Sequence, residues 1–324
     1  MDSIWHYPRP DLVAHYLKIL QSGVSSHLAL IAPRRKGKTA FLLQDLVPAA
    51  RKRNFIPVYA SLWQNTSAPH EGIEQALKET LSSLSEGNLL TKLLRAKIRK
   101  TSISNDILGR MEVEFADNPM PATATEITRL DALLSELQKK AKKKTVLLLI
   151  DEVQHLATSE KFDPLTHALR TMLDKRQGKV KAIFTGSSRH YMYLLFHESQ
   201  SPFYHFVEPV PFPDMDEGFV DFIQRTLQKR FQITTSRKAL WSAFVAVDHS
   251  PYWMMKMVSY MITFATTLPN ARHHVEAMME ATENFGEVAR SLKPLDKLVF
   301  IELCEHGNPF SKQFMAKVDA QTDV

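Results

Sequence analysis

Residues 32 to 39 read A-P-R-R-K-G-K-T, which places a glycine, a lysine and a hydroxyl group at consecutive positions. Only glycine takes a positive φ angle without steric cost, so Gly37 lets the chain curve tightly around a small anion. The Lys38 ammonium then lies between two phosphates, and the Thr39 hydroxyl binds Mg²⁺. An apolar run, 27 to 32, precedes the loop and a helical pattern follows it, as a phosphate-binding loop requires. The sequence therefore predicts a nucleotide site.

Ala32 stands where such a loop usually begins with glycine. The position lies at the end of the strand, so a methyl group is tolerated there if the φ angle stays negative. We therefore expect the loop to hold ATP despite this change. The residues expected to contact ATP in the loop are Pro33, Arg34, Arg35, Lys36, Gly37, Lys38, Thr39 and Ala40.

Two acidic residues, Asp151 and Glu152, end a second apolar run, TVLLLID at 145–151. Buried carboxylates are costly unless they meet a metal ion or a hydrogen-bond donor. In a P-loop enzyme the first acid holds Mg²⁺ and the second orients the attacking water. Thr39 and Asp151 are thus the predicted Mg²⁺ ligands, and Glu152 is a predicted catalytic residue together with Lys38 and Asp151. A nucleotide switch without turnover does not need Glu152.

Polar residues also end the next apolar run, KVKAIFTGS at 179–187. Adjacent parallel strands bring their carboxyl ends to one crevice, so a side chain here can reach the γ-phosphate or its water. Each of them could equally cap the following helix. We assign Thr185 to the catalytic set; the other candidates are Ser187, Ser188 and Arg189.

Short apolar runs alternating with helical patterns predict the fold class. The predicted strands are 27–32, 55–63, 145–151, 179–187 and 206–212, the last at an edge because it holds Pro209 and Pro211. Helical patterns cover 8–22, the residues after the loop up to Pro48, 70–86, 89–100, 125–143, 216–231, 236–246, 251–267, 272–289, 293–305 and 309–318. The sequence thus predicts an α/β P-loop NTPase with a parallel sheet flanked by helices, followed by an all-α lid and C-terminal domain.

The expected domain boundaries follow from the same patterns. The α/β domain takes residues 1–213 and includes a basic helical insertion at about 64–144. An α-helical lid takes residues 214–292, and a C-terminal helical segment takes residues 293–324.

Positive charge is concentrated in one segment. The net charge of the 324 residues is +6, and between Asn88 and Thr145 there are 12 Lys and Arg against 7 Asp and Glu. Basic patches are typical of nucleic-acid binding, although a charge run is often a solvated helical face. We predict that the basic segment 92–144 contacts a polyanion through Lys92–Lys100 and Lys139–Lys144. DNA is the favoured partner, and an acidic protein client is the alternative.

Several classes of protein are disfavoured by composition. No apolar run reaches the ~20 residues that span a bilayer, and the N-terminal residues lack the pattern of a secretory signal. We therefore expect a cytoplasmic protein without a membrane segment. Cys304 is the single cysteine, which excludes an intramolecular disulfide and fits a reducing compartment. The histidines lack the spacing of zinc ligands, so zinc is not expected.

These motifs resemble those of the STAND and AAA+ groups of P-loop ATPases, and most of all the archaeal-ATPase-like family. That family typically reads G-P-R-R-x-G-K-T in the loop and I-D-E-x-Q-x-L at the acidic strand, here IDEVQHL at 150–156. It continues with G-S-S, here 186–188, then S-P-L-Y-G-R, here SPFYHF at 201–206, and G-x-P-Y, here HSPY at 249–252. The resemblance covers about residues 8 to 268.

The resemblance implies an ATP hydrolase that couples nucleotide state to conformation or assembly, including nucleotide-dependent homo-oligomers, and thereby regulates a macromolecular client. It implies that Pro251 approaches the base and that Thr185 or Ser187 is a sensor-like group. Besides Ala32, the departures are His205-Phe206 for Gly-Arg and His249 for the lid glycine. Residues 293–324 could hold only the first helices of a winged-helix module, so DNA binding is not carried over from the family. A nucleotide-locked signalling scaffold and a small-molecule kinase are the alternatives.

Overall fold

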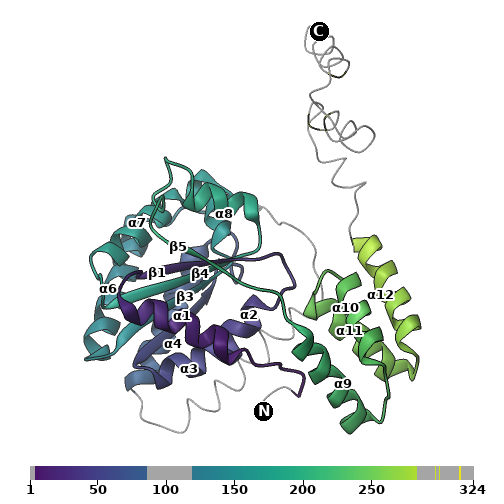
Figure 1. Ribbon diagram of the computed structural model, residues 1–324. Helices are drawn as coiled ribbons and strands as arrows, with labels where there is room; N and C mark the ends of the chain where they lie inside the picture. The colour runs from purple at the N-terminus through teal and green to yellow at the C-terminus, as the bar shows by residue number, and fades with distance from the viewer. Residues whose placement is uncertain (1–3, 86–118, 283–295, 297–298, 300–313, 315–324) are drawn as a thin grey trace. The chain divides into compact units, whose positions relative to one another are not determined.

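The computed structural model describes residues 4–85 and 119–282, together with residues 296, 299 and 314. Five parallel strands form one sheet in the order β2-β3-β4-β1-β5 (Figure 1). They are β1 (His27–Ile31), β2 (Phe55–Ser61), β3 (Thr145–Asp151), β4 (Val180–Gly186) and β5 (Glu208–Pro211). All five predicted strands are confirmed, and β5 lies at an edge as its prolines indicate.

Helices cover both faces of this sheet because alternate residues of each strand point to opposite sides. In β3, Val146, Leu148 and Ile150 pack against one set of helices, and Leu147 and Leu149 pack against the other. The first set comprises α4 (Pro69–Ser85), α6 (Ala124–Ala141), α7 (Asp163–Asp174) and α8 (Arg189–Phe196). The second comprises α1 (Pro10–Ser22) and the helical segment after the phosphate loop. Both faces of the parallel sheet are thus buried.

The helical segment after the loop changes its winding along its length. It consists of α2 (Lys38–Ala40), a π-helical stretch (Phe41–Leu46) and α3 (Val47–Lys52). The sequence pattern predicts that Pro48 bends or ends this helix, but the helix continues through it to Lys52. Pro48 lies in the first turn of α3, directly after the wider π-helical turn, where a missing backbone N–H is tolerated.

The chain after β5 is helical in the described residues, as predicted. It forms α9 (Glu217–Phe231), α10 (Arg237–Ala246), α11 (Pro251–Phe264) and α12 (Leu268–Thr282). Asp216 and Ser236 cap the first two of these helices, because their side chains accept hydrogen bonds from backbone N–H groups. The protein therefore has the α/β P-loop fold with a helical C-terminal region.

The contacts divide the chain into two compact units, Met1–Lys256 and Met257–Val324. The boundaries at 213/214 and 292/293 remain predictions from the sequence. The helical pattern at 89–100 lies outside the described residues, as do Cys304 and the patterns at 293–305 and 309–318 apart from residues 296, 299 and 314. Within the described ranges, none of the helices combines the length and the apolar character needed to cross a bilayer.

Candidate nucleotide-binding site

The loop Ala32–Thr39 connects β1 to α2 and turns through two residues with positive φ angles. Gly37 has a φ of 86°, the positive value that its residue type predicts, and Arg35 has a φ of 67°. Ala32 is buried and is not among the residues with positive φ, so this position does not need glycine for backbone reasons. The Phe41 amide donates to the Gly37 carbonyl at 3.0 Å, and the helix thus begins directly after the loop. This geometry lets the loop and the first helical turn surround an anion.

The Lys38 ammonium lies inside the loop and is buried. Its Nζ atom donates to the backbone oxygens of Ala32, at 2.6 Å, and Pro33, at 2.9 Å. Burial lowers the pKa of Lys38, and the negative charges of Glu152 and Asp151 oppose this shift. The lysine and both acids from β3 therefore share one electrostatic environment, as the sequence motifs predict.

Asp151 accepts hydrogen bonds from three hydroxyl groups that belong to three other elements. The Thr39 Oγ1 atom donates to Oδ2 at 2.6 Å, the Tyr59 hydroxyl donates to Oδ2 at 3.0 Å, and the Thr185 hydroxyl donates to Oδ1. Asp151 is 1% exposed, so these hydroxyl groups replace water as hydrogen-bond donors to its carboxylate. The strand order explains the arrangement, because β4 lies between β3 and β1 and puts Thr185 beside both motifs.

Glu152 follows in a left-handed conformation, with a φ of 57°, and its carboxylate has two partners. Gln154 Nε2 donates to Oε2 at 2.5 Å, and Ser187 Oγ donates to the same oxygen at 2.8 Å. Burial, and then the charge of Asp151, raise the pKa of Glu152, while the Gln154 hydrogen bond, the Lys38 charge and the Ser187 hydrogen bond act in the opposite direction. A carboxylate held in this way is suited to accept a proton from water.

The residues that end β4 thus have different roles in the structure. Thr185 contacts Asp151 and Ser187 contacts Glu152, whereas Ser188 caps α8 by accepting from the Tyr191 amide. Arg189 is exposed in the first turn of α8. Gln154 is not among the site residues that the sequence predicts, although the I-D-E-x-Q-x-L pattern contains it.

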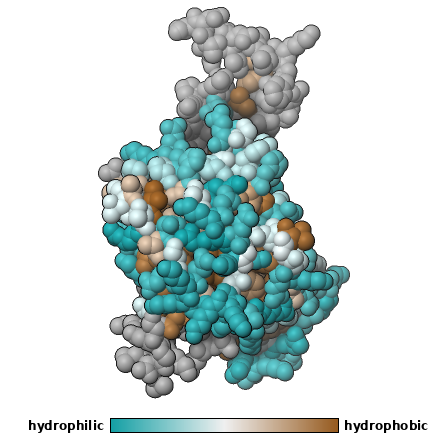
Figure 2. All heavy atoms as spheres, turned by 90° about the vertical axis from the view of Figure 1, so that its left-hand side faces the viewer, coloured by the Kyte–Doolittle hydropathy of each residue, from teal (hydrophilic) through white to brown (hydrophobic). Residues whose placement is uncertain are grey.

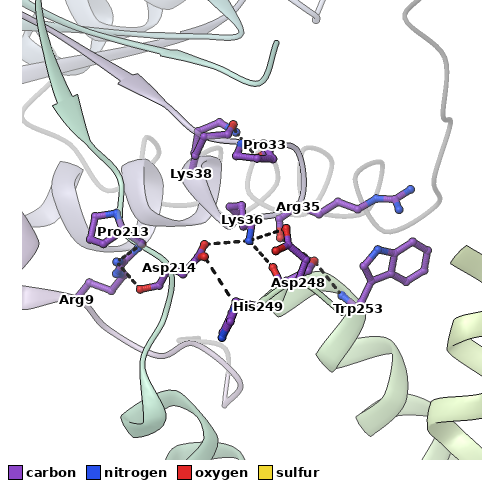
Figure 3. A network of polar contacts seen from close by, with 12 residues as sticks. Arg9, Pro33, Arg35, Lys36, Lys38, Pro213, Asp214, Asp248, His249 and Trp253 are labelled. Atoms are coloured by element: carbon purple, nitrogen blue, oxygen red, sulfur yellow. Dashed lines mark hydrogen bonds and ion pairs between the residues drawn. The ribbon is translucent and has the colours of Figure 1, made fainter. Parts of the chain in front are cut away.

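Three loop side chains predicted to contact ATP have partners within the protein, and Figure 3 shows two of them, Arg35 and Lys36. The Arg34 guanidinium lies 4.6 Å from the ring centre of Trp63, and that of Arg35 lies 4.2 Å from Trp253. The third, Lys36, forms ion pairs with two aspartates, Asp214 at 3.0 Å and Asp248 at 3.1 Å, and it also donates to the Asp248 backbone oxygen. In this structure the three side chains thus contact other parts of the protein, and their contact with ATP stays a prediction.

The segment that begins α11 lies against the loop. A Cβ atom placed on Gly37 would be 3.6 Å from Pro251 Cγ and from Met215 Cε. Ser250 Oγ donates to the Arg35 backbone oxygen at 3.1 Å. Pro251, which the family resemblance places near the base, therefore lies close to Gly37 of the same loop.

The residues present fit a nucleotide with Mg²⁺. Mg²⁺ is commonly bound through one or two carboxylates with waters and phosphates, and Thr39 and Asp151 place a hydroxyl and a carboxylate 2.6 Å apart. In the described part of the chain, no group of three or more His, Cys, Asp or Glu side chains could hold a metal ion.

Known protein structures share this architecture at low sequence identity. The Walker-type ATPase of Pyrococcus abyssi has a TM-score of 0.59 and 15% identity, over 92% of this chain and 81% of its own. This chain shares the α/β P-loop fold of that structure. The ORC2 protein of Aeropyrum pernix, solved as ADPNP–ADP complexes, has a TM-score of 0.56 and 14% identity over 93% of this chain and 76% of its own.

A further structure with this architecture, the ORC1 protein of Aeropyrum pernix in complex with DNA, has a TM-score of 0.50 and 13% identity over 94% of this chain and 74% of its own. At these identities the likeness shows the α/β P-loop fold alone. The sequence matches neither a protein-family profile nor a curated protein.

Proposed function

We propose that this protein is a Mg²⁺-dependent ATP hydrolase of the AAA+ and STAND type, nearest to the archaeal-ATPase-like family. The observation that carries the proposal is the placement of Glu152. Its partly buried carboxylate lies beside Asp151 and in the electrostatic field of Lys38, and two donors, Gln154 and Ser187, fix it. A protein that only binds nucleotide does not need this second acid.

Each site residue has a separate role in the proposed hydrolysis of ATP. Mg²⁺ and ATP together supply the γ-phosphoryl group and the charge that activates it. Lys38 neutralises negative charge that develops on the phosphates, and its ammonium is already held by the loop carbonyls of Ala32 and Pro33. Thr39 and Asp151 would hold the metal ion, and Thr185 positions Asp151. Glu152 accepts the proton of the water whose oxygen bonds to the γ-phosphorus, as the bond from that phosphorus to the leaving ADP breaks.

The test compares wild type with Glu152→Gln in two assays, ATP binding by calorimetry and steady-state phosphate release. We expect slow hydrolysis in the wild type and at least a hundredfold loss in the variant, with ATP affinity changed by less than threefold. Equal turnover in both proteins would refute the assignment of Glu152. Absence of hydrolysis in the wild type, with tight ATP binding, would favour the nucleotide-locked scaffold.

We further propose that turnover changes the conformation or assembly of the protein and so regulates a macromolecular client in the cytoplasm. The contacts between the loop and residues 214, 248 and 250 support this, because they join the phosphate loop to the segments that lead into the helical region. The proposed division is an ATPase domain, 1–213, a lid, 214–292, and a C-terminal segment, 293–324. Size-exclusion chromatography with Glu152→Gln, with and without ATP, tests nucleotide-dependent self-association.

A further inference from the structure

Exposed lysines and arginines gather at the edge of the sheet where the strands begin, whereas the nucleotide site lies at the edge where they end. They come from the loops that precede β2, β3 and β4 and from the last turns of α3 and α6, which lead into the first two of these loops. We name these ten residues the amino-edge cluster: Arg51, Lys52 and Arg53 before β2, Lys139, Lys140, Lys142, Lys143 and Lys144 before β3, and Lys175 and Lys179 before β4.

The strand order brings the three loops together. β2, β3 and β4 are neighbours and parallel, so the loops that precede them lie side by side (Figure 1). Two backbone hydrogen bonds link them: the Thr145 amide donates to the Asn54 oxygen at 3.1 Å, and the Val146 amide donates to the Lys179 oxygen at 2.9 Å. Neighbouring strands are about 5 Å apart, so the cluster extends over roughly 10 Å across the sheet.

The acidic residues near this edge are already paired. Asp131 binds Arg176 at 2.8 Å, Glu136 binds Lys140 at 2.9 Å, and Asp174 binds Arg170 at 2.7 Å. Within residues 4–85 and 119–282, no ion pair involves five of the clustered cations, namely Lys142, Lys143, Lys144, Lys175 and Lys179. The cluster therefore keeps an excess of positive charge whose self-repulsion a polyanion would relieve.

The chemistry of the cluster favours nucleic acid over an acidic protein. Protein interfaces have an apolar, often aromatic centre, but none of the large exposed hydrophobic side chains in the described residues lies in these three loops. The side of the molecule where the strands begin faces the viewer in Figure 2, and mostly hydrophilic residues cover it. Duplex DNA presents one negative charge per ≈1.7 Å, which is about six charges over 10 Å.

We propose that the amino-edge cluster binds the phosphate backbone of duplex nucleic acid without regard to base sequence. The three loops contain no aromatic residue on which an unpaired base would stack, which favours a duplex over a single strand. This inference rests on the proposed function, since it names the class of client. The proposed surface adds the loops before β2 and β4 to the basic segment predicted from the sequence. One part of that segment, Lys92–Lys100, lies outside the described residues.

The experiment compares two variants of the full chain that have the same net charge. The edge variant reverses one cation in each loop, with Arg53→Glu, Lys143→Glu and Lys179→Glu. The control reverses three exposed cations of α9 and α10, with Lys229→Glu, Arg230→Glu and Lys238→Glu. Each changes the charge of +6 by −6, to zero. Fluorescence anisotropy of a labelled 30-base-pair duplex, titrated between 50 and 200 mM salt, measures binding.

We expect steeply salt-dependent binding of the wild type, at least tenfold weaker binding of the edge variant at 50 mM salt, and less than a threefold change in the control. The slope of log K against log salt should fall by about 0.9 for each lost phosphate contact. Equal losses in both variants, no loss in the edge variant, or no binding by the wild type would overturn the inference. So would displacement of the duplex by polyglutamate as effectively as by unlabelled DNA of equal charge.

ATP hydrolysis distinguishes failure of this inference from failure of the proposed function. The cluster lies at the opposite edge from Lys38 and Glu152, so the edge variant should hydrolyse ATP at the wild-type rate. If the edge variant also lost ATP hydrolysis, the DNA titration would be repeated with the milder variant Arg53→Gln, Lys143→Gln and Lys179→Gln. We expect this variant to bind the duplex more weakly than the wild type, by a smaller factor than the edge variant. A wild type that hydrolyses ATP and ignores DNA would refute this inference and leave the proposed function standing.

Discussion

Lys36 Nζ lies 3.1 Å from Asp248 Oδ2, and this ion pair joins the phosphate loop to a residue 212 positions later in the chain. The two side chains differ in environment, since that of Lys36 is 5% exposed and that of Asp248 is 82% exposed. Asp214 holds the same ammonium from the segment after β5 and lies 4.0 Å from His249 (Figure 3). The loop is therefore fixed both by its own curvature and by these two aspartates.

Lys36→Met should lower the free energy of unfolding by about 1–2 kcal/mol, because the cation that joins the two aspartates is lost while both of them keep access to water. ATP affinity should change by less than threefold, since Asp214 and Asp248 already bind the ammonium. Urea unfolding and calorimetry measure the two effects. Lys229→Met, on the exposed surface of α9, is the control and should cost under about 0.5 kcal/mol. A loss of ATP binding as large as that of Lys38→Ala would place Lys36 on the phosphates instead.

Lys38→Ala should abolish measurable ATP affinity. Its charge-assisted hydrogen bonds to phosphate have no substitute, because the neighbouring cations Arg34 and Arg35 lie over aromatic rings. Calorimetry with ATP and Mg²⁺ measures the loss. An affinity equal to that of the wild type would show that this loop does not bind the nucleotide.

Ala32→Gly should change ATP affinity by less than tenfold. Ala32 does not need a positive φ, and its backbone oxygen accepts the Lys38 hydrogen bond whichever residue stands there. The buried methyl group packs in the core, so stability should fall by about 1 kcal/mol. Calorimetry and urea unfolding measure the two quantities. A gain in affinity well above tenfold would mean that alanine impairs the loop.

Gln154→Leu should reduce ATP turnover by about ten- to a hundredfold and leave ATP affinity within threefold, because Glu152 loses the 2.5 Å hydrogen bond that orients it. Ser187→Ala should have a smaller effect of the same kind. Ser188→Ala, which removes only the cap of α8, is the control; it should cost about 1 kcal/mol of stability and leave kcat unchanged. Similar kcat values for the Gln154→Leu variant and the wild type would show that Gln154 is structural.

His27 should make stability depend on pH. Burial, with a smaller contribution from Lys181, lowers the pKa of His27 to about 4, although Asp174 acts in the opposite direction. Between the unfolded pKa of 6.5 and about 4, the unfolded chain binds the proton and the folded chain does not, so stability falls as the pH falls. Urea unfolding should show a loss of about 2 kcal/mol between pH 7 and pH 5.

His27→Leu should remove most of this pH dependence, because the titrating group is gone while an apolar side chain still packs against Phe206. An unchanged slope in that variant would assign the pH dependence to other groups.

Local patterns in the sequence were enough to predict the strands, the phosphate loop and the two acids. The five strands are short apolar runs bounded by polar residues, and Gly37, Lys38 and Thr39 are consecutive, so no distant contact was needed to find them. The positive φ of Gly37 likewise follows from its residue type alone.

Tertiary structure decided what depends on strand order and on residues far apart in the chain. No local pattern predicts a partner for Lys36, because Asp214 and Asp248 lie 178 and 212 positions later. The pairing of Thr185 with Asp151 and of Ser187 with Glu152 requires β4 to lie beside β3. The amino-edge cluster has the same origin: parallel neighbours collect the loops that precede them at one edge, and only the fold determines which strands are neighbours.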